Sequence, residues 1–307
     1  MACGREQGAY IAWHAGTTES CNTVLSLAEL LDLAENHIIH VAHINSYCRG
    51  ETADVLDEVR EALRLLSLHQ NAYSEAYLAE TNGTIFELDE AGHMTSKSTG
   101  RLLVRYGYGD SAEGLEKAFK DGFARAFAPS GLETVPIYGE AAIKLWRANG
   151  LRVNGGFDVN PAISRLNLCM AKYHNNDFIV DAISTDGGAI PRNVIVSHGL
   201  ALVAIGALTL AEFVLKTSYH PSRILCLPQK GHLGPGADAD ITVLDLETRR
   251  PMLTMVGGKV CMFKGYVSGT GGTILTTRRG LDAASQYGLP VKVIDVSAGP
   301  LPFRKPH

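Results

Sequence analysis

The strongest constraint on the fold is an alternation of strand-like and helix-like segments near the start of the chain. Apolar runs at 9–14, 37–43 and 71–80 alternate with stretches at 23–36 and 51–69 whose leucines follow helical spacing. This alternation is typical of parallel sheets, because two parallel strands need a crossover connection, usually a helix. The sequence therefore predicts an α/β fold built on a parallel sheet.

Three apolar runs stop on side chains that can bind a metal. "AYIAWH" ends on His14, "HIIHVAH" ends on His43, and "FIVDAISTDGG" reaches Asp186 at its polar end. In an α/β barrel the active site lies at the carboxyl ends of the strands. Two neutral imidazoles and a carboxylate suit Zn²⁺ or a similar divalent ion, which lowers the pKa of bound water to about 7 and makes hydroxide available. A carboxylate nearby can then move the proton.

Each of these residues also has a structural interpretation. A histidine at a strand end is often a hydrogen-bonded structural residue, and an aspartate in "STDGG" can simply cap its loop. Side chains alternate along a strand, so His37, Ile39 and Val41 are expected on the side of His43, with His40 facing the helix layer. The pattern alone leaves both interpretations open.

The remainder of the chain reads in three parts. Residues 81 to about 160 are expected to be an insertion, with helices at 111–128 and 139–149 and glycine-rich loops. From residue 234 to 275 the sequence consists of short apolar runs separated by glycine-containing turns. This pattern favours a small antiparallel β-domain. Residues 276–307 are expected to be a C-terminal tail that covers a surface or a partner.

Composition excludes several classes of protein. The 307 residues carry a net charge of −4 without a basic run, so nucleic acid is not an expected partner. The most apolar stretch, 194–215, contains His198 and Glu212 and is interpreted as buried helices, so no membrane contact is expected. Six scattered cysteines without a C-x-x-C pair indicate reduced thiols and a cytoplasmic protein.

The sequence resembles the amidohydrolase superfamily in four segments taken together. They are "WHAGTTE", "VAHINS", "ISTDGG" and the closing "GHLGPGADADITVLDLETRRPMLTMVGGKVCMFKG". The spacing is most like the D-aminoacylase branch, and the hydantoinase and dihydroorotase branch is next. The resemblance implies that His14 and His43 are metal ligands ending the fifth and sixth barrel strands. It also implies that Asp186, ending the eighth, holds metal or water and shuttles protons. One or two divalent ions, Zn²⁺ by expectation, would be the cofactor.

The sequence departs from that family in two ways. Members have an H-x-H pair on the first strand and a bridging Lys, Cys or Glu on the fourth, and neither is found here. The expected fold class is therefore α/β: the second half of a TIM-type (β/α)8 metal-dependent hydrolase barrel in residues 1–233, plus a small β-sandwich subdomain. We expect a second polypeptide to supply the N-terminal half-barrel in a higher hetero-oligomer. The alternatives are an inactive scaffold or regulatory subunit and a truncated fragment.

The expected reaction is hydrolysis of a non-peptide C–N bond in a cyclic amide, a ureide or an N-acyl amino acid. Five further residues are predicted to touch this small-molecule substrate. Glu75 and Tyr77 share a face of the strand at 71–80, and Asn45 follows His43 directly enough to bind a leaving group. Arg192 and Asn193 follow the Asp186 loop and could bind a substrate carboxylate. Packing, salt bridges and solvated loops are the alternatives for this group.

Overall fold

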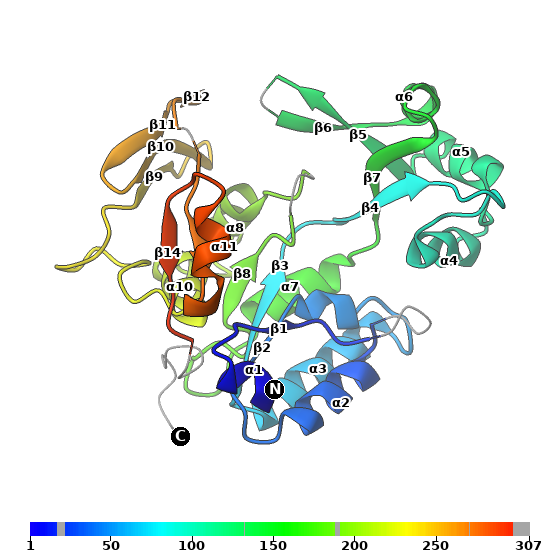
Figure 1. The fold of residues 1–307 in the computed structure, drawn as a ribbon. Helices are drawn as coiled ribbons and strands as arrows, with labels where there is room; N and C mark the ends of the chain where they lie inside the picture. Colours follow the sequence, from blue (N-terminus) through cyan, green and yellow to red (C-terminus); the bar gives the residue numbers. More distant parts are fainter. Residues whose placement is uncertain (17–21, 132, 188–190, 270, 297–307) are drawn as a thin grey trace.

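The computed structural model describes residues 1–16, 22–131, 133–187, 191–269 and 271–296 (Figure 1). Its centre is a four-stranded parallel sheet in the order β1-β2-β3-β8. The strands are short: β1 Ala12–Trp13, β2 Ile39–Val41, β3 Ala72–Tyr77 and β8 Ala182–Ser184. The predicted parallel sheet is therefore present, although the described residues form no closed barrel.

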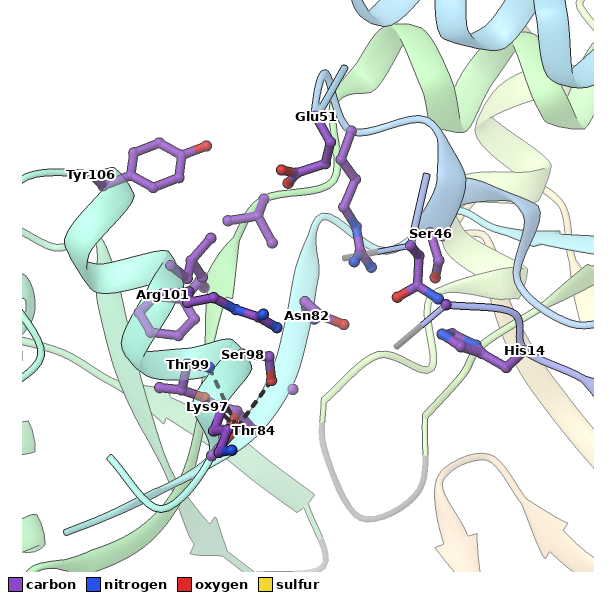
Figure 2. A pocket seen from close by; sticks show the side chains of 18 of the residues that line it. His14, Ser46, Glu51, Asn82, Thr84, Lys97, Ser98, Thr99, Arg101 and Tyr106 are labelled. Atoms are coloured by element: carbon purple, nitrogen blue, oxygen red, sulfur yellow. Dashed lines mark hydrogen bonds between the residues drawn. The ribbon is translucent and has the colours of Figure 1, made fainter. Parts of the chain in front are cut away.

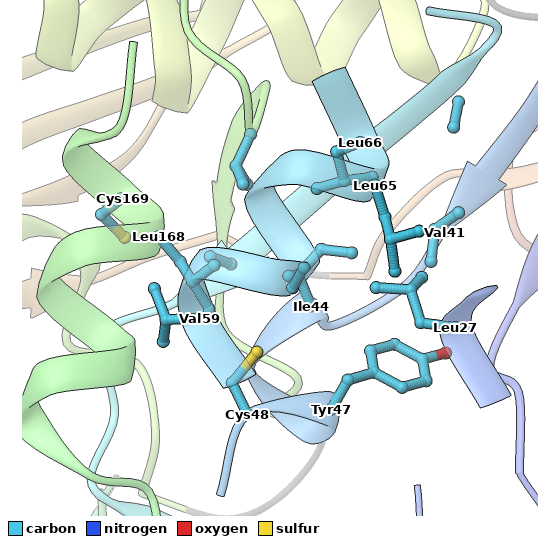
Figure 3. Packing of buried hydrophobic residues seen from close by; sticks show 14 of the residues in the cluster. Leu27, Val41, Ile44, Tyr47, Cys48, Val59, Leu65, Leu66, Leu168 and Cys169 are labelled. Carbon is cyan, nitrogen blue, oxygen red and sulfur yellow. The ribbon is translucent and has the colours of Figure 1, made fainter. Parts of the chain in front are cut away.

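Helices cover one face of this sheet and bury the larger of the two main cores. Leucines of α2 (Val24–Ala34) and α3 (Val55–Leu68) pack on Ile39 and Val41, with α7 (Ala162–Met170) beside them (Figure 3). The sequence signals both helix starts: Thr23 forms a capping box with Ser26, and the Asp54 side chain accepts a hydrogen bond from the Leu56 amide. These caps fix where each helix begins.

Residues 81–158 form a separate antiparallel sheet in the order β4-β7-β5-β6 with its own core around Trp146 and Phe86. Its elements are β4 Thr81–Glu87, α4 Lys97–Arg105, α5 Ala112–Lys120, β5 Ala124–Ser130, β6 Glu133–Ile137, α6 Gly139–Ala148 and β7 Arg152–Asp158. The helix predicted at 111–128 is wrong beyond Lys120, because Gly122 turns the chain with a φ of 74° and a strand follows.

After β8 the chain runs through helices and then a small antiparallel sheet, β12-β11-β10-β9. The sheet is one layer among the described residues, not the expected sandwich. The predicted boundary at 275 falls inside β13, which pairs in parallel with β14 from the expected tail. The elements are α8 Ile195–Ala204, α9 Leu210–Val214, the π-helical η2 Leu215–Tyr219, α10 His220–Ile224, β9 Ile241–Asp245, β10 Arg250–Val256, β11 Lys259–Phe263, β12 Tyr266–Val267, β13 Ile274–Thr276, η3 Arg278–Gly280, α11 Leu281–Ser285 and β14 Val291–Val293.

Two short helices complete the described fold, α1 (Ala2–Glu6) and the 3₁₀ turn η1 (Ile44–Tyr47) directly after His43. In the part of the chain that the structure describes, no helix has both the length and the apolar character needed to cross a bilayer.

Candidate active site

The three predicted ligands come together at the carboxyl edge of the parallel sheet. His14 follows β1, His43 follows β2, and Asp186 follows β8. The ring centroids of His14 and His43 lie 5.6 Å apart, and His43 Nε2 lies 3.2 Å from Asp186 Oδ1. Residues far apart in the sequence thus meet because parallel strands end at one edge of the sheet.

The backbone at two of these positions is strained. His43 has a φ of 52° and Asp186 a φ of 47°, in the left-handed region that residues with a Cβ rarely adopt. Such a conformation costs about 1–3 kcal/mol and persists only where neighbours hold it. The His43 amide donates a hydrogen bond to Glu75 Oε1 at 3.2 Å, and Arg192 holds Asp186. Strain held in this way is typical of functional sites.

Glu75 lies behind His43 and not at the open side of the site. Its Oε1 is 3.0 Å from His43 Nδ1, and its other carboxylate oxygen accepts a hydrogen bond from the Ser184 hydroxyl. Burial raises the pKa of Glu75, but the contacts with His43 outweigh it and leave that pKa lowered. In this structure the carboxylate orients His43, whereas the sequence predicted a contact with substrate.

Two carboxylates therefore face the His43 ring, one at each nitrogen. Burial lowers the pKa of His43, but the contact with Glu75 and the charges of Glu75 and Asp186 outweigh it, so the net pKa is raised. Burial lowers the pKa of His14 more than its hydrogen bond with Asn22 raises it. His14 is thus favoured as the neutral imidazole that metal binding requires, and the field around His43 favours a cation.

The predicted alternation along β2 is wrong. Ile39 and Val41 pack into the helix core, while His40 points to the Glu75 side, with Nε2 3.8 Å from Glu75 Oε1. The Tyr10 hydroxyl forms a 2.7 Å hydrogen bond with His40 Nδ1. Because the strand ends at Val41 and His43 is left-handed, the period of two does not extend to His43.

Arg192 lies under the Asp186 loop and is only 2 % exposed. Its Nη1 donates to the Asp186 backbone oxygen at 2.8 Å and to Asp186 Oδ2 at 2.7 Å, and its guanidinium lies 4.5 Å from the Tyr77 ring centroid. The structure thus gives Arg192 a positioning contact, while Asn193 beside it is exposed.

Asn45 and Tyr77 join the loop after β2 to the end of β3. The Asn45 amide group donates to the Tyr77 backbone oxygen at 3.1 Å, and its oxygen accepts from the Tyr77 amide at 2.8 Å. Both side chains are fully buried. Their predicted contact with substrate stays a prediction, and the contacts present hold the strand end in place.

A cavity of about 700 Å³ opens beside His14, between the parallel sheet and the insertion (Figure 2). Figure 2 shows His14 and Ser46 on one side, Lys97 and Thr84 on the other, and Arg101 reaching into the space between them. Most of the residues that line it are polar or charged, although apolar atoms supply more of its surface than polar atoms do. The polar and charged residues are His14, Asn22, Ser46, Arg49, Glu51, Asn82, Thr84, Thr95, Ser96, Lys97, Ser98, Thr99 and Arg101.

Sequence reasoning missed Arg49 and the α4 side chains of this wall. The one signal available was that "SYCRG" continues directly from "VAHIN", which puts a cation within reach of the His43 strand end. Nothing in the sequence indicated that α4 folds back toward the sheet.

The donor types fit a divalent metal only in part. Two imidazoles and a carboxylate are ligands that Zn²⁺ accepts, and His43 Nδ1 is buried without a well-aligned hydrogen bond, facing Glu75 as a carboxylate commonly faces a metal-bound histidine. However, in the described ranges no group of three or more His, Cys, Asp and Glu side chains is arranged as a metal site. A complete site therefore needs donors or rearrangement beyond what these residues present.

Comparison with known proteins agrees with this architecture. The parallel α/β arrangement is of the kind found in TIM-barrel-type folds, although the described residues form no closed barrel. The sequence profile described as the amidohydrolase family matches residues 50–270, and the chain belongs to that family. Glu75 and Asp186 lie inside the matched range, and His14 and His43 lie before it.

Two curated relatives are dihydroorotases, matched over short segments. The one from Syntrophus aciditrophicus (strain SB) is 61% identical over 46 residues, which is 15% of this chain and 11% of that protein. The one from Pelotomaculum thermopropionicum is 49% identical over 51 residues, 17% of this chain and 12% of that protein. The matched segments therefore span about a tenth of these relatives.

Solved structures share the fold at low identity. The formyltransferase/hydrolase complex FhcABCD from Methylorubrum extorquens matches with a TM-score of 0.54 and 16% identity, covering 94% of this chain and 56% of that chain. A D-aminoacylase, described with a binuclear metal centre, matches with a TM-score of 0.54 and 12% identity, covering 87% and 56%. This chain thus spans about half the length of these structures.

Proposed function

We propose that this protein is part of a metal-dependent amidohydrolase that hydrolyses a non-peptide C–N bond. The bond would lie in a cyclic amide, a ureide or an N-acyl amino acid. The observation that carries the proposal is the meeting of His14, His43 and Asp186 at the carboxyl edge of the parallel sheet, beside a cavity lined mainly by polar residues. The named relatives, dihydroorotase and D-aminoacylase, support this class of substrate.

In this proposal His14 and His43 hold a divalent ion, by expectation Zn²⁺, together with Asp186. When bound, such an ion supplies a Lewis acid and activates water near neutral pH. Glu75 fixes the orientation of His43 through Nδ1, so that Nε2 is left to face the site. Asp186 receives a proton from water and passes it to the leaving nitrogen, and Arg192 holds its carboxylate for this.

We further propose that the described sheet is the second half of the barrel, with residues 81–160 inserted and residues 234–275 as the small β-domain. The four strands leave β1 and β8 as free edges of an open parallel sheet in the described structure. Parallel sheets are normally covered on both faces and closed or capped at their edges. A second polypeptide with the H-x-H half would close the barrel and add ligands, and the multi-chain FhcABCD neighbour supports such an assembly.

Hydrolysis assays on the purified protein, with any polypeptide that co-purifies, test the proposal. Probes are dihydroorotate, hydantoin and N-acetyl-D-amino acids, each with Zn²⁺ and after dialysis against a chelator. We expect turnover of at least one probe that chelation abolishes and added metal restores. His14→Ala and His43→Ala should each lose it, whereas the exposed control His93→Ala should retain it. Turnover that is unaffected by the chelator and by both variants would refute the proposal.

A further inference from the structure

We infer that Arg49 binds the carboxylate of an acidic substrate in the cavity beside His14. The inference rests on the proposed hydrolase function and narrows its substrate class to compounds with a free carboxylate near the scissile C–N bond. Among the alternatives above, this favours N-acyl amino acids and carboxylated cyclic amides over neutral cyclic amides such as hydantoin.

The structure holds Arg49 in place while leaving its charge uncompensated. Its Nε donates to Asn160 Oδ1 at 3.1 Å, and its Nη2 donates to the Tyr77 hydroxyl at 2.8 Å. Both acceptors are neutral, and no carboxylate of the described residues forms an ion pair with Arg49. Its Nη1 makes no hydrogen bond within that part of the chain, so one arm of the guanidinium is available to a ligand.

The loop that carries Arg49 is held in place by hydrogen bonds to a buried carboxylate of α3. The buried Glu58 carboxylate accepts hydrogen bonds from the amides of Gly50 and Thr52, each at 2.7 Å, and from the Thr52 hydroxyl at 2.9 Å. A loop held by a buried carboxylate presents its side chains with little loss of entropy on binding. Arg49 and His14 line the same cavity.

Most of the other charged side chains in the cavity wall are cations. Lys97 and Arg101 of α4 line the side opposite His14 (Figure 2). The cavity's carboxylate, Glu51, is already paired with Arg105. A cavity whose charged lining residues are mostly cations favours an anion.

Arg192, which the sequence suggested for this role, is poorly placed for it. It is buried beneath Asp186, and Nη1 is engaged twice with that residue. Arg49 instead lines the open cavity and retains an unused donor. The cation that recognises the substrate carboxylate is therefore assigned to Arg49 in the loop after β2, and not to Arg192 in the loop after β8.

The test compares binding of two probes of nearly equal shape, N-acetylalanine and its uncharged amide N-acetylalaninamide. Calorimetry is performed on the full chain, with any co-purifying polypeptide, at low salt. A charge-assisted hydrogen bond in a half-enclosed site predicts a roughly 10–100-fold preference for the carboxylate. Arg49→Met should reduce this ratio to near one, and Arg49→Lys should retain part of it. The exposed control Arg64→Met, which loses only a surface pair with Glu61, should retain all of it.

Three results would overturn the inference. The wild type could bind both probes with equal affinity, or a folded Arg49→Met variant could keep the wild-type affinity ratio between the probes. The third is that Arg64→Met lowers this affinity ratio as much as Arg49→Met does. If Arg49→Met does not fold, Lys97→Met on the opposite wall serves as the test variant. Its preference for N-acetylalanine over N-acetylalaninamide must then fall severalfold. Metal content is measured in the same samples. A metal-free protein that prefers the carboxylate contradicts the hydrolase proposal alone, and a metalloenzyme that hydrolyses both probes equally well contradicts only this inference.

Discussion

Replacing Arg192 by Met should destabilise the protein and leave ligand preference unchanged. The Arg192 side chain is 2 % exposed and makes two charge-assisted hydrogen bonds to Asp186. Each such bond contributes about 1.5–3 kcal/mol to the free energy of unfolding when it is counted separately. Its contact with the Tyr77 ring adds about 1–2 kcal/mol. Against this, Nε and Nη2 are buried without a hydrogen-bond partner in the described structure, and removing them recovers about 1–3 kcal/mol. The net loss expected is about 2–4 kcal/mol, because Asp186 is one-third exposed and can rehydrate.

The assay is urea unfolding followed by tryptophan fluorescence in a Trp146→Phe background. Trp13 is then the only tryptophan of the chain, and it lies in β1 of the parallel sheet, next to His14. A double-mutant cycle with Asp186→Asn should give a coupling energy of about 1–3 kcal/mol. A loss below about 0.5 kcal/mol, the size expected for an exposed pair such as Arg64 with Glu61, would refute this account of Arg192.

Three further predictions concern other parts of the chain. Glu75→Gln should weaken metal retention about 10–100-fold in chelator competition, because the carboxylate that orients His43 is lost, and unchanged retention would contradict this. Trp146→Ala should cost about 3–5 kcal/mol and unfold the insertion first, since the ring is fully buried and its Nε1 donates to the Phe86 oxygen; amide exchange confined to 81–158 would report it. Burial lowers the pKa of Lys216 to about 8, so the folded state releases this proton before the unfolded state does. The free energy of unfolding should therefore rise between about pH 8 and 10.5 by up to ~3 kcal/mol relative to Lys216→Met, and parallel pH profiles would be inconsistent with that pKa.

The alternating strands and helices and the edge of the sheet were predictable from local sequence. Leucine spacing and the caps at Thr23 and Asp54 mark α2 and α3, and the apolar runs that stop at His14 and His43 mark two of the strand ends. Parallel pairing then brings Asp186 to the same edge, although more than a hundred residues separate it from His43.

What escaped prediction depends on contacts that no local pattern records. The left-handed backbone at His43 interrupts the side-chain alternation from which His40 was expected to face the helix layer. This backbone conformation accompanies a hydrogen bond from the His43 amide to Glu75 on the next strand. The position of Arg49 depends on Glu58 in α3 and on Asn160 at the end of the insertion. The sequence predicts helix across the start of β5, because the alanines and phenylalanine of this strand also fit a helical face.

The central claim is that this chain contributes His14 and His43 to a metal site completed by other strands. Native mass spectrometry with metal analysis, on protein purified from its source, tests it most directly. The account predicts a complex with a second polypeptide and one or two Zn²⁺ per pair, with the metal lost in His14→Ala and His43→Ala. A metal-free protein with no second polypeptide would contradict it.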